Sequence, residues 1–315
     1  MLKNTFPRRS LLAAAAILSL GAIVRAGPED PIRVVATIPD LANFAEVIGG
    51  NRVQVKSLSR GTEDLHRVPV RPSMLIALSR ADLFLEVGLS MEVGWIPELL
   101  IKANNRRIRP GSPGFKNCSV GWEAIQVPAF PTRAIGDVHP QGNPHMNIDP
   151  LGGLHLATKV HEALVEYDPE HREGYDERFR AWRKRYDEKK AYWDSIGEKL
   201  KGRKAVVYHM EFNYFTKRVG MDVPLAIEPQ PGMPPTPGHV AKVIKMMREQ
   251  EVELILTAGW SNNRVAADVA RKSGATVLEL PNQVKGASWA GNWIDMMTGI
   301  YERVAEALDV EVESP

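Results

Sequence analysis

Histidine is the residue type whose placement in this sequence best suits chemistry. Of the eight histidines, four stand in loops or directly after strand-like stretches: His66, His139, His145 and His209. Ligands of open α/β sheets bind beyond the carboxyl ends of the strands. Neutral imidazole is also the commonest side-chain ligand for zinc and related ions. These positions therefore predict a metal site. The other four histidines lie on helical stretches or at a helix start, and we interpret them as surface or capping residues: His155, His161, His171 and His239.

Strand-like and helix-like segments alternate in both halves of the chain. In the first half, strands are predicted at 33–38, 53–59 and 82–88. The stretch 104–132 is rich in Pro and Gly, so we expect it to be irregular. In the second half, strands are predicted at 204–208, 223–227, 252–257 and 276–280, with Pro224 weakening the second. This alternation predicts an α/β fold of two lobes, 32–168 and 201–312, each with a parallel sheet flanked by helices.

A long charged stretch, 169–200, separates the two halves. It has helical spacing of apolar and aromatic residues and no internal proline. A helix of this length would extend about 48 Å at 1.5 Å per residue. A single α/β lobe has no need of such a rod, so we predict one helix that links the two lobes. The alternative is a long solvated helix packed on one lobe.

The first 26 residues are typical of a signal peptide. A basic stretch with Arg8-Arg9 precedes an apolar run at 11–24, and Ala26 offers a small residue for cleavage. The run is too short for the roughly 20 residues of a membrane helix. The arginine pair also fits twin-arginine export. Cys118 is the single cysteine and lies far from the cleavage region, so we expect neither a disulfide nor a lipid anchor on cysteine.

The charge balance bears on the kind of partner. Residues 1–26 hold basic residues and no acid, and acidic residues slightly outnumber basic ones in the rest of the chain. Binding of nucleic acid needs a clustered basic surface that neutralises phosphates. We therefore expect no nucleic-acid partner.

Three motifs, in this order, resemble those of the metal-binding subunits of zinc- and manganese-type ABC importers. The first is D-L-H at 64–66 with P-S at 72–73, the second is N-P-H-M-N-I-D-P at 143–150, and the third is H-M-E-F-N-Y-F at 209–215. The resemblance extends over about residues 32–308. It implies two α/β lobes joined by one long helix, with His66 and His145 from the first lobe and His209 from the second binding one metal ion.

The chain departs from that family pattern at three positions. Leu65 replaces a proline and Asn147 replaces a tryptophan, and both changes leave the histidines in place. The family commonly ends its last strand with leucine-aspartate-proline, where the aspartate is the fourth ligand. Here the sequence is L-E-L-P-N at 278–282. Asn282 offers a neutral amide, which is a poor substitute for a carboxylate on a divalent ion.

Three residues are candidates for the fourth ligand, and water is a further alternative. Glu228 ranks first because it follows a predicted strand of the second lobe and precedes a proline-rich stretch, although it could instead form a salt bridge. His139 ranks second because it lies six residues before His145. Glu211 ranks third, two residues after His209.

These observations predict a periplasmic solute-binding protein that captures a divalent transition metal and delivers it to an ABC permease of the inner membrane. Three histidines without the aspartate favour Zn²⁺, with Mn²⁺ as the alternative. We expect a monomer without enzymatic activity. An extracytoplasmic metal chaperone or sensor would use the same site residues. A zinc hydrolase would also use three histidines, but the sequence has no H-E-x-x-H or similar catalytic motif.

Overall fold

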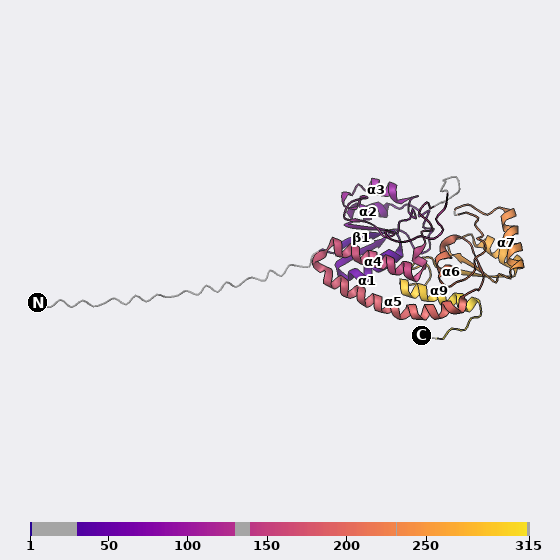
Figure 1. Cartoon of the computed structure of the whole chain (residues 1–315). Coiled ribbons are helices and arrows are strands. Elements are labelled where there is room, and N and C mark those ends of the chain that lie inside the picture. The colour runs from indigo at the N-terminus through magenta and orange to yellow at the C-terminus, as the bar shows by residue number, and fades with distance from the viewer. Residues whose placement is uncertain (2–29, 130–138, 231, 314–315) are drawn as a thin grey trace. The chain divides into compact units, whose positions relative to one another are not determined.

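The computed structural model describes Met1 and residues 30–129, 139–230 and 232–313. The predicted signal peptide, apart from Met1, lies outside the described residues. Residues 31–315 form one compact unit, which contains two sheets. We call the parts built on these sheets the first and second lobes (Figure 1).

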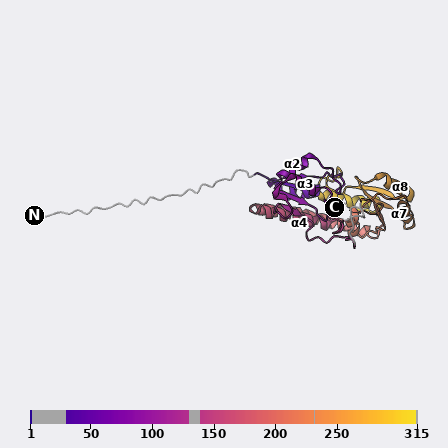
Figure 2. The ribbon, with the colours of Figure 1, turned by 90° about the horizontal axis from the view of Figure 1, so that it is seen from above.

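The first lobe is built on a parallel sheet with the strand order β2-β1-β3-β4. Its strands are β1 (Ile32–Ala36), β2 (Val53–Ser57), β3 (Leu83–Glu86) and β4 (Phe115–Asn117). Alternate strand residues face opposite sides. Val34 and Leu85 pack toward α1 (Pro39–Gly49) and α4 (Pro150–Tyr167), while Val35 and Phe84 pack toward α2 (Pro72–Arg80) and α3 (Ile96–Ala103). Figure 2 shows α2 and α3 together in this lobe.

The second lobe repeats this layering on a parallel sheet with the order β5-β6-β7. Its strands are β5 (Ala205–Val207), β6 (Leu254–Ala258) and β7 (Thr276–Leu280). Val206 and Ile255 pack with residues of α7 (Pro237–Glu249) and α8 (Asn263–Ser273), while Val207 and Leu256 belong to the core that includes α9 (Trp293–Ala307). A short helix, α6 (Asn213–Arg218), follows β5. The predicted α/β class with two parallel sheets is confirmed.

Two local predictions were wrong. The stretch 104–132 was expected to be irregular, yet it contains β4, which pairs with β3 at the sheet edge. Its signal is weak because only three residues pair. The predicted strand at 223–227 makes only isolated bridges, Lys204 with Asp222 and Val207 with Ala226. Pro224 has no N–H to donate, so a continuous ladder cannot form there.

The predicted linking helix is α5 (Arg172–Leu200), and it contacts both lobes. Near its start, Arg178 donates to the carbonyl oxygens of Ile48 and Gly49 at the end of α1. Near its end, Trp193 Nε1 donates to Thr298 Oγ1 of α9 at 3.0 Å. Figure 1 shows α5 passing beneath both lobes, beside α1 and α9. The interpretation of 169–200 as a connection between lobes is confirmed.

Buried aromatic rings fill the space between α5 and the rest of the molecule. Trp182, Tyr186 and Trp193 of α5 pack against Trp293 of α9 with ring centroids 5.9–6.3 Å apart. Phe44 of α1 joins the cluster by contacts with Trp182 and Trp293. One apolar core therefore connects elements of both lobes. Among the helices of the described part, none has the length and apolar character needed to cross a membrane.

Candidate metal centre

Three predicted histidines meet in the structure. His66 lies in the loop between β2 and α2, His145 directly precedes the 3₁₀ turn η4 (Met146–Ile148), and His209 lies between β5 and the 3₁₀ turn η6 (Met210–Phe212). All three are at least nine-tenths buried. Their ligand atoms lie within 4.8 Å of one another, and among the described residues this is the one group of His, Cys, Asp and Glu side chains with metal-site spacing.

The spacing of the ring nitrogens suits a tetrahedral ion. His145 Nε2 lies 3.2 Å from His66 Nε2 and 3.3 Å from His209 Nε2. Two nitrogens bound to one zinc at about 2.0–2.1 Å lie about 3.3–3.4 Å apart in tetrahedral geometry. The ring of His145 stands nearly perpendicular to the rings of His66 and His209, at 89° and 85° respectively. A single proton on His145 Nε2 cannot bond both neighbours at once, so the convergence fits a shared cation better than a chain of protons.

Short turns fix the backbone of two of these histidines. The Asp64 carboxylate accepts the His66 N–H at 2.9 Å, and the Asn143 side-chain oxygen accepts the His145 N–H at 2.9 Å. These are Asx turns, which Asp and Asn favour in loops. The Asn143 amide also donates to the carbonyl oxygen of Met210, the residue after His209, at 2.8 Å. Asn143 therefore connects the His145 turn to the second lobe.

Glu228 lies beside His209, on the side of the ring away from the other histidines. Its Oε2 is 2.5 Å from His209 Nδ1, whereas Nε2 of the same ring faces His145. A carboxylate on Nδ1 fixes the tautomer that leaves Nε2 free to bind a metal. The group with metal-site spacing does not include Glu228, so a direct contact of Glu228 with the ion stays a prediction.

His139 also lies near the centre. Its ring is 4.8 Å from the ring of His66 at an interplanar angle of 35°, so the two rings are closer to stacking than to the perpendicular arrangement of the other pairs. His139 and His145 line a cavity of about 190 Å³ with His209, Asn143 and Gln126. The cavity gives a small ion or water space beside the histidines.

Glu211 is a buried carboxylate close to His209 in sequence. It is completely buried, and neither carboxylate oxygen has a hydrogen-bond partner among the described residues. Burial raises the pKa of Glu211 to about 7, against the opposing charge of His209. An unpaired polar group of this kind is costly to bury. A nearby cation would offset that cost.

The histidines differ in their acid–base behaviour. Burial, followed by the mutual repulsion of the rings, lowers the pKa values of His66 and His145 well below the usual range. For His209, burial alone would lower the pKa, but the hydrogen bond to Glu228 and the charges of Glu211 and Glu228 together raise it. His66 and His145 are therefore neutral at pH 7 and have nitrogen lone pairs to offer a metal.

Asn147, which replaces the family's tryptophan, contacts the segment after β7 where the family's aspartate is missing, and sequence reasoning missed this contact. The Asn147 amide donates to the Asn282 carbonyl oxygen at 2.9 Å and to the Asp40 carboxylate at 3.1 Å. Asn147 and Asn282 are 135 residues apart in sequence, and both lie outside the group of three histidines. Only the structure reveals this contact, because the two residues are far apart in the sequence.

Asp149 and the remaining histidines contact neighbouring residues that lie outside the group of three histidines. Asp149 caps the start of α4 by accepting from Leu151 N and forms an ion pair with Arg218. The helical histidines contact neighbouring side chains: His161 pairs with Asp176, His171 with Asp168, and His155 packs on Trp122. The backbone N–H of His239 contributes to the start of α7 by donating to Thr236 Oγ1. None of these four histidines belongs to the group of three.

Comparison with known proteins places the chain among metal-binding proteins. Residues 34–307 match the family model described as zinc-uptake complex component A, periplasmic. The iron-binding protein YfeA of Yersinia pestis is 23% identical over 278 residues, which cover 84% of this chain and 83% of that protein. The manganese ABC transporter substrate-binding lipoprotein PsaA of Streptococcus pneumoniae is 20% identical over 288 residues, which cover 89% and 90%.

A solved structure confirms the fold. The crystal structure of ZnuA superposes with a TM-score of 0.71 at 23% sequence identity, covering 88% of this chain and 99% of that chain. At this identity the likeness concerns the arrangement of helices and strands, while the chemistry of the site depends on the residues described above.

Proposed function

The chain belongs to the family of zinc-uptake complex component A, and we propose that it is a periplasmic solute-binding protein that captures a divalent transition metal between its lobes and delivers it to an ABC permease. The metal is the cargo of a binding protein, and the family performs no catalysis. The observation that carries the proposal is the convergence of the Nε2 atoms of His66, His145 and His209 at 3.2 and 3.3 Å.

We propose Zn²⁺ as the preferred cargo. Three neutral imidazoles are typical of zinc, whereas Mn²⁺ favours more carboxylate oxygen. The curated relatives are named for iron and manganese, so Mn²⁺ and Fe²⁺ are the competitors. This chain lacks the aspartate with which the family commonly ends its last strand, and this absence supports zinc over both.

The fourth coordination position is assigned to water, with Glu211 as the buried charge that balances the ion. Glu228 positions His209 through Nδ1, and His139 lies against His66 as a wall of the site. This assignment replaces the ranking drawn from the sequence, in which Glu228 came first as a direct ligand. It accounts for the contacts of Glu228 and for the unpartnered carboxylate of Glu211.

The remaining parts of the proposal concern location and partners. We assign residues 1–26 to a signal peptide, residues 32–168 and 201–312 to the two lobes, and 169–200 to the linking helix. The mature protein is proposed to be a periplasmic monomer that meets its permease at the inner membrane. A metal chaperone would use the same site, and an adjacent ATPase and permease gene would favour import.

Metal titration of the stripped mature protein tests the proposal. We expect one Zn²⁺ per chain, bound more tightly than Mn²⁺, and a melting temperature that rises with Zn²⁺ and does not rise with Mg²⁺, which prefers oxygen ligands. His145→Ala should abolish the rise because His145 contacts both other histidines, whereas His161→Ala serves as the control. If no first-row transition metal changes the melting temperature, the site is wrongly assigned.

A further inference from the structure

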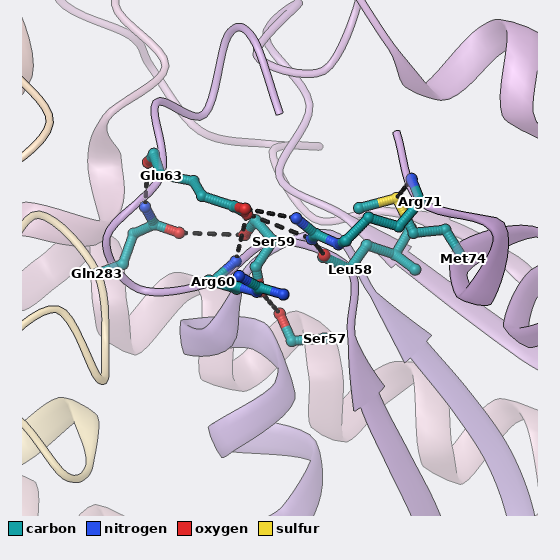
Figure 3. A network of polar contacts seen from close by, with 8 residues as sticks. All are labelled: Ser57, Leu58, Ser59, Arg60, Glu63, Arg71, Met74 and Gln283. Carbon is teal, nitrogen blue, oxygen red and sulfur yellow. Dashed lines mark hydrogen bonds and ion pairs between the residues drawn. The ribbon is translucent and has the colours of Figure 1, made fainter. Parts of the chain in front are cut away.

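The loop that holds His66, residues 58–71, is fixed by a network of polar contacts that includes a residue of the other lobe (Figure 3). Within the loop, the Glu63 carboxylate accepts from Arg60 N at 2.8 Å and pairs with Arg71 Nη1 at 2.5 Å. Arg71 also donates to the Leu58 carbonyl oxygen at 2.5 Å. Arg71, at the end of the loop, therefore bonds both to Leu58 at its start and to Glu63 between them.

Gln283 reaches this loop from the second lobe, three residues after β7. Its side chain accepts from Ser59 Oγ at 3.1 Å and donates to the Glu63 carbonyl oxygen at 2.9 Å. The residue is completely buried, and both ends of its amide are used. A buried amide with both groups satisfied favours one geometry, because any displacement leaves a polar group unpaired.

The neighbours of Gln283 hold the same segment against the first lobe. The Asn282 carbonyl oxygen accepts from Asn147, and the Val284 N–H donates to the Asp40 carboxylate at 3.1 Å. At Gly61, an added Cβ would lie 2.4 Å from the Val284 carbonyl oxygen, so only glycine permits this approach of the two backbones. Each of the residues 282–284 therefore forms a hydrogen bond to the first lobe.

We propose that Gln283 is a positioning residue for metal capture, which holds the His66 loop in its binding conformation from the opposite lobe. The inference rests on the proposed function. Glu63, whose carbonyl Gln283 binds, lies three residues before His66, and Asp64 next to it accepts the His66 N–H. A ligand binds more tightly to a loop that is already ordered, because the loop then loses less conformational entropy in the binding step. Without the Gln283 amide, the ion itself must order the loop.

The test compares Gln283→Met with a matched control, Asn105→Leu. Methionine keeps the length and removes both hydrogen bonds. Asn105 is a half-buried residue whose side-chain amide donates to two backbone carbonyls, those of Leu78 and Ala81, and it lies away from the His66 loop. By competition with a chromophoric chelator, we expect Gln283→Met to bind Zn²⁺ about tenfold or more weakly, as outer-shell changes do. Asn105→Leu should stay within about threefold of the wild type.

Two further readouts separate positioning from general destabilisation. The visible spectrum of bound Co²⁺ should change in Gln283→Met and stay the same in Asn105→Leu. In metal-free protein, hydrogen exchange over residues 58–71 should speed up in Gln283→Met alone. If Gln283→Met does not fold, Ser59→Ala removes one of the two bonds and should give a smaller loss of the same kind.

The outcomes distinguish this inference from the proposed function. Equal Zn²⁺ affinity, spectrum and loop exchange in Gln283→Met and the wild type would overturn the role of Gln283 while leaving metal capture intact. Equal losses in Gln283→Met and Asn105→Leu would overturn it as well. If the wild type binds no transition metal, the proposed function fails, and loop exchange still reports whether Gln283 holds the loop.

Discussion

Glu228 and His139 are the two residues near the three histidines whose proposed roles are easiest to separate by mutation. Glu228 bonds to His209 Nδ1 at 2.5 Å, and the ring of His139 lies against His66. We expect Glu228→Gln to weaken Zn²⁺ binding by about 10–100-fold, because the amide no longer holds the His209 tautomer by charge. His139→Ala should change the affinity by less than about threefold. Chelator competition measures both, and the reverse order of losses would make His139 the fourth ligand.

Glu211 provides a prediction in which stability and binding change in opposite directions. Its carboxylate is buried without a hydrogen-bond partner in the described structure, at a cost of about 1–3 kcal/mol for such a group. Glu211→Met should therefore raise the melting temperature of metal-free protein by about 2–4 °C for each kcal/mol recovered. The same variant should bind Zn²⁺ more weakly, because the balancing charge is lost. A lower melting temperature in the metal-free state, measured by calorimetry, would contradict this account of Glu211.

Glu86, at the end of β3, should make the stability of the protein depend on pH. Burial and the neighbouring charge of Glu92 raise the pKa of Glu86 from 4.5 to about 8, while Asn117 donates to it. When the pKa of a carboxyl is higher in the folded than in the unfolded state, the protonated form favours folding. The contribution of protonated Glu86 to the free energy of unfolding is therefore complete below about pH 4.5 and is lost as the pH rises through about 8.

Metal-free protein should accordingly lose thermal stability between pH 5 and pH 8.5, and Glu86→Gln should flatten this dependence while keeping the acceptor for Asn117. Glu98→Gln is the control, since Glu98 is fully exposed on α3. Melting curves across this pH range measure the effect. Parallel curves for wild type and Glu86→Gln would show that Glu86 does not govern the slope.

Local elements and the three histidines could be predicted from the sequence because their signals are local. Alternating segments predict parallel sheets, an uninterrupted helical pattern predicts α5, and motifs around His66, His145 and His209 predict the site. Contacts between distant residues could not be predicted in this way. The position of Glu228 depends on backbone hydrogen bonds of Ile227 and Glu228 to β5 and the residue after it. The contact between Asn147 and Asn282 joins residues that are 135 positions apart in the sequence. β4 was missed because three residues at a sheet edge give almost no pattern.

The aromatic core between α5 and α9 makes the two lobes one folding unit. Trp193 of α5 is completely buried against Tyr186, Trp293 and Tyr301. We expect Trp193→Ala to reduce the free energy of unfolding by about 3–5 kcal/mol. Arg180→Ala, on the exposed face of the same helix, should cost less than about 0.5 kcal/mol. Urea unfolding followed by tryptophan fluorescence and circular dichroism should give coincident transitions, and two separated transitions would refute a shared core.

The contrast between α5 and the segments that hold the histidines has a consequence for the speed of metal exchange. The frame is a 29-residue helix in an aromatic core, while His66, His145 and His209 stand in a loop and beside 3₁₀ turns of three residues. Large movements of the frame would break that core, whereas a loop can move within nanoseconds to microseconds. The dissociation rate of the ion is therefore expected to depend on the movement of one of the short segments that hold the histidines. A permease that accelerates release of the ion would then need to bind and displace only that segment, and the distance between the two sheets would stay unchanged.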